Sequence, residues 1–328
     1  MIVGKMVKID LKDRKILYEL DLNCRQSNSQ IGKKVGLKRD IVAYRIKKLQ
    51  DDGIIKYFWT AINTFKLGYN VLRVYINFQY VNQNIKNEII QHFTNYRNVW
   101  SVISIKAEVD FDVIVWVRDM YEFYRFWDKT LDKFADYFAK YTISIYIEAF
   151  AYKKSYLLLE KYDGSNRVMY RTTCSGPPVK IDEIDYNLLN KIATNARILI
   201  IDVAKKLNCS SQTVTYRLKN LIKSGVIQAF RVSLDLSNFG LHHYKLEVYL
   251  KDHKKGKEIW NYLKHKPYLD YLNVAVGWCD LEFEVIVENT DKLSEIMTEI
   301  DLKFPNVIKK QTFWILEEYH KDRWLPEF

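Results

Sequence analysis

The chain has 328 residues, which at roughly 100 to 200 residues per domain predicts two to four domains. Apolar residues make up 48% of it and charged residues 28%, a balance that supports packed cores and argues against global disorder. The formal net charge of +11 favours a polyanionic partner, nucleic acid before an anionic membrane, although a lysine-rich genome would give the same surplus.

Neither a membrane span nor a secretory signal is expected, because no run of about 18 apolar residues occurs and the first ten residues lack an apolar core. The cysteines form no CxxC pair, and no histidine cluster accompanies them, which argues against a zinc site and a disulfide framework. We therefore expect a cytoplasmic protein with no metal and no other cofactor. The cysteines are Cys24, Cys174, Cys209 and Cys279.

An internal repeat organises the chain, because the sequence aligns with itself at an offset of 172 residues, without a gap for about fifty residues. Each repeat is domain-sized, so the duplication predicts tandem domains rather than a solenoid. Identical pairs in this register include Asn23 and Asn195, Arg25 and Arg197, Tyr44-Arg45 and Tyr216-Arg217, and Gly53 and Gly225.

Three helices are predicted in the first third of each repeat. Asp10 and Asp182 stand at helix starts, and a second Asp follows each three residues later, as in a capping box. Apolar residues at helical spacing, a polar break and a second short helix come next. A short turn then leads to a third helix, which ends at Gly53 or Gly225 as a C-cap glycine. This arrangement predicts a helix-turn-helix in each repeat.

The third helix carries the chemistry expected of a DNA-recognition helix. In the second copy Val214, Leu218 and Leu221 form the buried stripe, and polar and cationic residues lie on the opposite face. Segment 203–224 holds five basic residues and no acid, and segment 33–48 holds seven and one acid, Asp40. Such cations neutralise phosphates, and Gln, Thr and Tyr can reach base edges. The residues expected to contact DNA are Lys38, Arg39, Tyr44, Arg45, Lys47, Lys48, Ser211, Gln212, Thr215, Tyr216, Arg217, Lys219 and Lys223.

Alternatives stay open for this helix. Arg45 and Arg217 lie beside the buried stripe, where an intradomain ion pair competes with a phosphate contact. Asp40 faces outward, where it would repel phosphate or accept a hydrogen bond from a cytosine amino group, and it could weaken DNA binding by the first copy. A helix-turn-helix used only for packing is the remaining alternative, which the one-sided charge argues against.

The remaining two thirds of each repeat predict a ferredoxin-like domain. Period-two alternation after each glycine first predicts a strand, over 55–62 and 227–232. The element order that follows is β-α-β-β-α-β, whose sheet has one helix-covered face and one open face. The first copy gives strand 71–80, helix 84–96, strands 99–106 and 111–117, helix 120–139 and strand 141–151. The second copy gives strand 244–250, helix 255–265, strands 270–276 and 281–287, helix 291–303 and strand 307–317.

The predicted fold class is therefore α+β, with two winged helix-turn-helix domains and two ferredoxin-like domains in tandem. The linker is assigned from its glycines, prolines and scattered charges, and a short helix could begin at Ser155. We read the aromatic stripe of helix 120–139 as core and the adjacent His242 and His243 as structural, since neighbours on a strand point to opposite faces. The boundaries are 1–62 and 63–152 for the first copy, 153–180 for the linker, and 181–235 and 236–328 for the second copy.

These features resemble the Lrp/AsnC, or feast/famine, family of transcription regulators. The resemblance covers nearly the whole chain, and the second copy matches better. The segment VGWCD at 276–280 is similar to the family's Gly-x-x-Asp turn between the middle strands. The other residues that carry the resemblance are the Asp-x-x-Asp starts at Asp10 and Asp182, the stretch SSQTVTYRLKNLIKSGVI from Ser210, and the pairs Leu67-Gly68 and Phe239-Gly240.

The resemblance implies a regulator that binds double-stranded operator DNA and senses an amino acid or related metabolite near that turn. The implied effector-binding residues are Gly277 and Asp280 in the second copy, and Ala107 and Asp110 in the first. The first copy departs from the family in having Ala107 in place of Gly. It also departs in Lys38 and Arg39, where the family's recognition helix opens with a small polar residue.

Single-copy members of the family pair as homodimers, so the open sheet faces lead us to expect that copy one pairs with copy two within this chain. A further homo-oligomer is left open. Because the two recognition helices differ in their outward residues, the preferred DNA site is expected to be non-palindromic.

Two other functions are weighed against regulation. A related branch consists of decarboxylases that act on a sirohaem-type tetrapyrrole, and it carries a His-Asn-Tyr-type motif in the second sensor strand. Segments 98–104 and 270–276 lack that motif, and no spacing suggests a nucleophile, base and orienter, so we do not expect an enzyme. The other alternative is a ligand-binding protein that no longer binds DNA.

Overall fold

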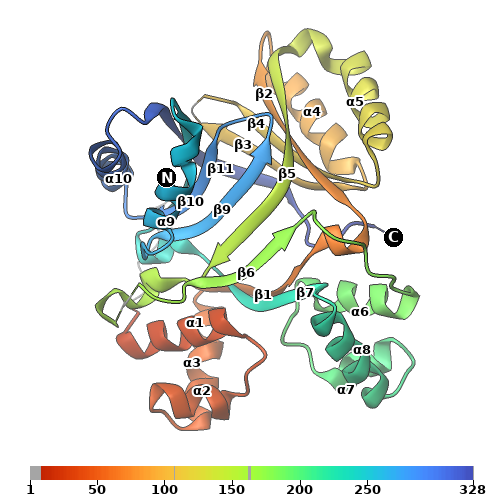
Figure 1. Cartoon of the computed structure of the whole chain (residues 1–328). Helices are drawn as coiled ribbons and strands as arrows, with labels where there is room; N and C mark the ends of the chain where they lie inside the picture. Colours follow the sequence, from red (N-terminus) through yellow and green to blue (C-terminus); the bar gives the residue numbers. More distant parts are fainter. Residues whose placement is uncertain (1–8, 107, 162–163, 328) are drawn as a thin grey trace.

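The computed structural model describes residues 9–106, 108–161 and 164–327. Two three-helix units lie side by side at one end of the molecule, and a large curved sheet with helices on its outside forms the rest (Figure 1). The first unit comprises α1 (Leu11–Leu22), α2 (Asn28–Val35) and α3 (Arg39–Asp51). The second comprises α6 (Glu183–Ala193), α7 (Ile200–Lys206) and α8 (Ser211–Lys223). Both predicted helix-turn-helix units are confirmed.

The helix starts follow the predicted capping chemistry. The Asp10 carboxylate accepts the main-chain N–H of Asp13 at 2.8 Å, and the Asp13 carboxylate accepts that of Asp10 at 3.2 Å. The second copy repeats this capping box. The recognition helices differ, because Ser210 caps α8 by accepting the N–H of Thr213 at 3.0 Å, whereas Lys38 at the start of α3 provides no side-chain cap. The departure seen in the sequence therefore removes one capping hydrogen bond from α3.

The two copies are joined directly beneath their helix-turn-helix units. β1 (Ile55–Ile62), which follows α3, pairs antiparallel with β7 (Ile227–Leu234), which follows α8. Arg25 and Arg197 reinforce this pair, since each donates from Nη1 to a main-chain carbonyl of the other copy, at 2.6 and 2.5 Å. Each guanidinium also lies over a phenylalanine ring of the other copy, at 5.5 and 5.4 Å. The strand after each recognition helix thus links the two units.

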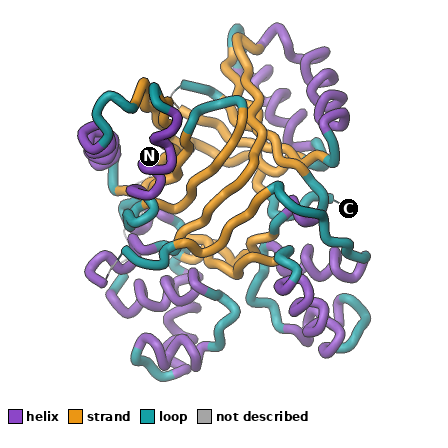
Figure 2. The backbone as a smooth tube through the Cα atoms, in the orientation of Figure 1, coloured by secondary structure: helices purple, strands orange, loops and turns teal. Residues whose placement is uncertain are grey.

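The strands of the two ferredoxin-like halves form one closed sheet (Figure 2). Within the halves the orders are β5-β2-β4-β3 and β11-β8-β10-β9, as the β-α-β-β-α-β motif requires. β3 pairs with β11 and β5 pairs with β9, so each half satisfies both edges of the other. The first half contains β2 (Asn70–Phe78), β3 (Val99–Lys106), β4 (Phe111–Val117) and β5 (Phe138–Tyr152). The second contains β8 (His242–Leu250), β9 (Leu269–Val276), β10 (Leu281–Val287) and β11 (Ile308–Asp322).

Helices cover the outside of the closed sheet, so its inner surface is formed by the open faces of both halves (Figure 1). The copies therefore pair within the chain, and they do so edge to edge as well as face to face. Under the helices the packing is apolar, and Phe123, Trp127 and Phe134 are buried there, which agrees with the core interpretation of that stripe. The covering helices are α4 (Gln83–Asn95), α5 (Met120–Phe134), α9 (Gly256–Leu263) and α10 (Thr290–Lys303). None of the described helices is long and apolar enough to cross a bilayer.

Three segments differ from the predicted elements, and one of them is β11, which ends at Asp322 rather than at residue 317. α5 ends at Phe134 rather than at residue 139, and after a short 3-10 turn β5 begins at Phe138. Phe138 continues the four-residue spacing of the apolar stripe, but its buried side chain belongs to the strand. The expected linker also has regular structure, a 3-10 segment at Ser155–Lys161 and strand β6 (Val168–Thr173), which pairs with β5. The connection is therefore packed against the sheet.

Candidate DNA interface and interior cavity

Both recognition helices present their polar face to solvent. Tyr44 and Tyr216, which occupy equivalent positions, are each 67% exposed. Thr215 is half-buried and donates its hydroxyl to a main-chain carbonyl within α8 at 2.7 Å. The two units project from the same end of the molecule, so neither helix is covered by another part of the described chain (Figure 1). The other predicted contacts that are exposed are Lys38, Arg39, Lys47, Lys48, Ser211, Gln212, Lys219 and Lys223.

The two recognition faces differ in how much of their positive charge is free. In the first copy Lys47 lies 3.6 Å from the carboxylate of Asp51, which lies on the same helix. In the second copy neither Lys219 nor Lys223 forms an ion pair with any residue that the structure describes. The carboxylate of Asp51 competes with a phosphate for Lys47, whereas Lys219 and Lys223 have no such competitor among the described residues.

Arg45 and Arg217 form the intradomain ion pairs that the sequence left open. Nη1 of Arg45 lies 2.8 Å from a carboxylate oxygen of Asp10 and 2.7 Å from one of Asp13. Arg217 makes the equivalent contacts at 2.8 and 3.0 Å. Each arginine therefore ties its recognition helix to the start of the first helix of the same unit. Their contact with DNA stays a prediction. It would require each guanidinium to bind a phosphate as well as these carboxylates.

The predicted effector residues at the turns have structural partners. Asp110 and Asp280 each accept a main-chain N–H at the end of the first sheet strand of their copy, at 2.8 Å. Gly277 has a φ of +100°, and a Cβ there would lie 2.5 Å from a carbonyl oxygen of β5. Only glycine therefore fits that position without a shift of the backbone. Ala107 lies outside the described residues, and effector binding at these four positions stays a prediction.

Inside the closed sheet, charged side chains of the two copies meet in a buried network. Arg73 and Lys245 stand at equivalent positions on β2 and β8, and Asp112 and Glu282 at equivalent positions on β4 and β10. Glu282 lies 3.1 Å from Nη1 of Arg73 and 2.6 Å from Nζ of Lys245, and Nε of Arg73 lies 3.3 Å from Asp112. Burial opposes ionisation, but the two cations lower the pKa of Glu282 to about 2. The network therefore holds the two copies face to face.

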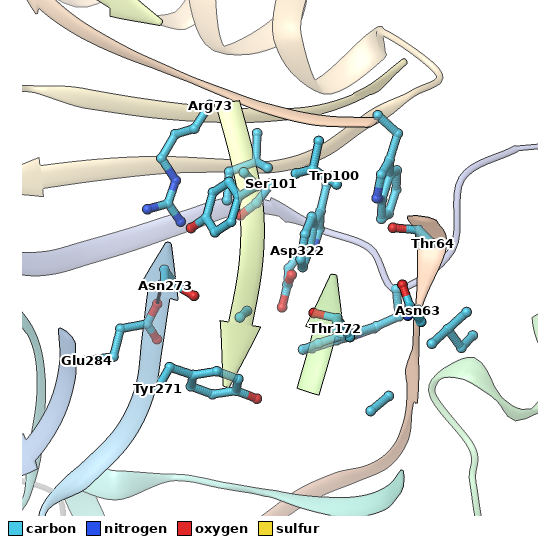
Figure 3. Close-up of a pocket in the computed structure, with 18 of the residues that line it drawn as sticks. Asn63, Thr64, Arg73, Trp100, Ser101, Thr172, Tyr271, Asn273, Glu284 and Asp322 are labelled. Carbon is cyan, nitrogen blue, oxygen red and sulfur yellow. Dashed lines mark hydrogen bonds between the residues drawn. The ribbon is translucent and has the colours of Figure 1, made fainter. Parts of the chain in front are cut away.

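A cavity of about 260 Å³ lies beside this network, inside the sheet and next to β1 (Figure 3). Its wall is largely aromatic. The rings of Trp59 and Trp324 stack at a centroid distance of 4.3 Å, and those of Trp100 and Trp116 at 5.3 Å. Apolar walls with a few placed polar groups are typical of small-molecule sites, so this cavity is the described feature best suited to a ligand.

Two carboxylates line the cavity, and they differ in whether another side chain pairs with them. Nε2 of His243 lies 3.1 Å from Glu284, and this contact outweighs burial and lowers the pKa of the Glu284 carboxyl. The carboxylate of Asp322, at the end of β11, points into the cavity, and no described residue donates a hydrogen bond to it or forms an ion pair with it (Figure 3). Asp322 keeps much of its surface exposed to solvent, and desolvation by the protein atoms packed around the rest of it raises the pKa of its carboxyl to about 7.

A cluster of possible metal ligands is explained without a metal. Single ligand atoms of Glu247, Cys279 and Glu282 lie within 4.8 Å of one another. Glu282 already pairs with Lys245, and the indole N–H of Trp278 donates to Glu247. A cation would have to compete with the ammonium group of Lys245, so the donor set suits a metal poorly.

Sequence reasoning did not single out the cavity residues. Asp322 lies in the run EEYHKDRW, which is typical of a solvated strand end. The sequence predicts only a structural role for His243, but its side chain contacts Glu284 and lines the cavity. The tryptophans are the one sequence feature that could have pointed to a ligand cavity, because four of the eight in the chain line it.

Comparison with known proteins agrees with the helix-turn-helix geometry. A family model described as winged helix-turn-helix DNA-binding matches residues 9–56 and 181–228. The transcriptional regulator LrpA of Bacillus subtilis is 42% identical over 71 residues, 21% of this chain and 52% of that protein. An uncharacterized HTH-type transcriptional regulator of Pyrococcus furiosus is 33% identical over 120 residues, 37% of this chain and 80% of that protein. The chain belongs to the Lrp/AsnC family of HTH-type transcriptional regulators.

Within the Lrp/AsnC family this chain is a tandem duplication. The two matched segments are separated by the repeat offset, and most of the Pyrococcus regulator aligns within a length that one repeat supplies. The crystal structure of the siroheme decarboxylase NirDL matches 97% of this chain and 94% of its own, with a TM-score of 0.63 and 13% sequence identity. That similarity shows that this chain and the decarboxylase share a fold over nearly their whole lengths.

Proposed function

We propose that this regulator binds one asymmetric stretch of duplex DNA through both recognition helices at once. This proposal is supported above all by the position of α3 and α8. Both helices are exposed on the same end of the molecule, and they are linked through the β1–β7 pair. Paired helix-turn-helix units read half-sites at a fixed spacing along one face of DNA. Here the spacing is set within a single chain.

The operator is expected to consist of two unlike half-sites. Tyr44 and Lys47 are repeated in the second copy, but Arg39, Asp40 and Ala43 correspond to other side chains there. Since bases are read by these outward side chains, the two helices should prefer different sequences. The corresponding residues of the second copy are Ser211, Gln212 and Thr215.

Binding selection from random DNA with the full chain measures this asymmetry. We expect two different half-sites at constant spacing. The variant Arg39→Ser/Asp40→Gln/Ala43→Thr gives α3 three of the outward residues of α8, and it should shift the selected site toward an inverted repeat. A symmetric site for the wild-type protein would contradict asymmetric reading. No enrichment of any DNA would contradict DNA binding and favour a ligand-binding protein that no longer binds DNA.

We also propose that a small molecule modulates DNA binding. Family resemblance supports an amino acid or related metabolite near the turns of Gly277 and Asp280 and of Ala107 and Asp110. The interior cavity offers a second position for an effector. Repeating the selection with and without free amino acids tests modulation independently of where the ligand sits.

A second candidate function, tetrapyrrole decarboxylation, is favoured by the fold similarity to NirDL, whose structure is also known in complex with an iron-uroporphyrin III analogue. The cavity supports this function poorly. A uroporphyrin carries several carboxylates, whereas Arg73 is already paired with Asp112 and Glu282, and Asp322 adds a further negative charge.

We therefore expect the absorbance spectrum of iron-uroporphyrin III to stay unchanged when the purified chain is added. Release of carbon dioxide with a shifted spectrum would favour the enzyme.

A further inference from the structure

We propose that the interior cavity binds a small molecule that carries a protonated amine on an apolar or aromatic body, with the carboxylate of Asp322 as the partner of the amine. The ligand site is argued from the cavity itself. Its effect on DNA rests on the proposed regulatory function.

The charge of the ligand follows from the pairing of the carboxylates around the cavity. Glu282 is matched by Arg73 and Lys245, and Glu284 by His243. Asp322 lines the cavity and has no ion-pair or hydrogen-bond partner among the described residues. An unpaired carboxylate beside aromatic rings attracts a cationic group that enters the cavity, because the carboxylate and the ring faces both favour positive charge. The same carboxylate repels an anionic ligand.

The body of the ligand follows from the walls. Trp59 and Trp324 present stacked rings on one side, and Trp100 stacks on Trp116 on another. Aromatic faces attract both an ammonium group and the apolar carbon skeleton that carries it. A volume of about 260 Å³ suits a small metabolite rather than a macrocycle.

The cavity is connected to the DNA-binding units through β1. Trp59 and Ala61 lie on this strand and line the cavity. β1 follows α3 directly and pairs with β7, which follows α8. A ligand that contacts Trp59 therefore touches the strand pair that joins the two recognition helices. Coupling between two such sites typically changes affinity by roughly 5- to 150-fold, and a change in this range is expected for DNA.

Matched ligands of opposite charge test the site in the full chain. Calorimetry with 2-phenylethylamine, tyramine and tryptamine should show binding, whereas 3-phenylpropionate, which replaces the amine by a carboxylate, should not bind. Asp322→Asn should weaken amine binding at least tenfold. Glu318→Gln alters a carboxylate on the same strand that does not line the cavity, and it should leave the affinity unchanged.

Three binding results would each overturn the proposal: equal binding of the amine and the carboxylate, amine binding that Asp322→Asn does not weaken, or no binding of any of the three amines. Loss of binding in Asp280→Asn but not in Asp322→Asn would place the site at the turn instead. These measurements need no DNA, so they remain decisive if the chain fails to bind DNA. If it does bind, the amine should change DNA affinity in the wild type and not in Asp322→Asn.

A stability measurement shows whether Asp322→Asn is folded and whether the carboxylate is unpaired. Desolvation raises the pKa of Asp322 to about 7, so its ionisation costs the folded state stability as the pH rises from the unfolded pKa of about 4 to 7. Solvent at its exposed surface screens the charge and keeps that cost small. The neighbouring Tyr57 and Tyr319 have raised pKa values and stay neutral in this range, and Glu284 stays ionised. Asp322→Asn should therefore raise the melting temperature by about 2 °C at pH 8, and by less at pH 5. A lower melting temperature at pH 8 would show that the carboxylate has a stabilising partner and would overturn the proposal.

Discussion

Replacing Lys219 and Lys223 of α8 with glutamate is expected to lower DNA affinity at least tenfold, about 1.4 kcal/mol or more. Both side chains are exposed on the face opposite the buried stripe, and neither forms an ion pair with a described residue. Each lysine that contacts a phosphate releases counterions, so its loss lowers the slope of log affinity against log salt by about 1. The double variant should therefore also show a salt dependence that is shallower by about 2. Fluorescence anisotropy between 50 and 200 mM salt, roughly the range where such slopes are resolved, measures both effects.

A matched control is available on the outside of the sheet. Lys129 and Lys133 lie on α5 with the same four-residue spacing and are also exposed, but they are remote from both helix-turn-helix units (Figure 1). Lys129→Glu/Lys133→Glu makes the same change in net charge and should lower affinity far less. Equal losses in the two variants would show that only the overall charge matters. Unchanged affinity in the α8 variant would mean that DNA contacts another surface.

Asp21→Ala is expected to lower the free energy of unfolding by about 3–5 kcal/mol, because it leaves a buried arginine without its partner. Asp21, at the end of α1, and Arg231, on β7, are both 0% exposed. Nε and Nη2 of Arg231 donate to the two Asp21 oxygens at 2.8 and 3.0 Å, and the main-chain N–H of Lys154 donates to the same carboxylate at 2.9 Å. The substitution thus disconnects the first helix-turn-helix unit, the strand pair and the connecting segment at one point.

Denaturant unfolding followed by fluorescence and circular dichroism measures this loss. Glu317→Ala removes an exposed ion pair with Lys106 and should cost at most about 1 kcal/mol. Asp21→Leu/Arg231→Met removes both charges, and it should recover most of the loss, since apolar replacement of a buried pair is often neutral. A loss below about 1 kcal/mol in Asp21→Ala would contradict the buried pairing.

The helices and most strands were predictable because their signals are local. Asp10 and Asp182 with their partners three residues on fix the first helix of each unit, and the alternation after Gly53 and Gly225 fixes β1 and β7. Closure of the sheet was not predictable. The pairing of β3 with β11 and of β5 with β9 joins edges far apart in the chain, and a strand's own pattern does not identify its edge partner.

The candidate DNA interface could be predicted, whereas the cavity could not. Exposed cations on α3 and α8 follow from helical periodicity alone. The cavity depends on how equivalent positions diverge after duplication. Trp59 and Arg231 stand at the same position of the repeat, yet Trp59 lines the cavity and Arg231 pairs with Asp21. Both are buried, and period-two alternation says only that such a residue faces inward, not what it meets there.

Fusion of the two copies changes how this regulator responds to its own abundance. A pair held in one chain by β1–β7 and by both sheet edges does not separate on dilution, because a covalent link keeps its halves at an effective concentration of about millimolar. Operator occupancy should therefore rise with the first power of protein concentration, with no threshold for assembly. A defective chain cannot take the place of one copy in a normal pair, since each chain already holds both copies.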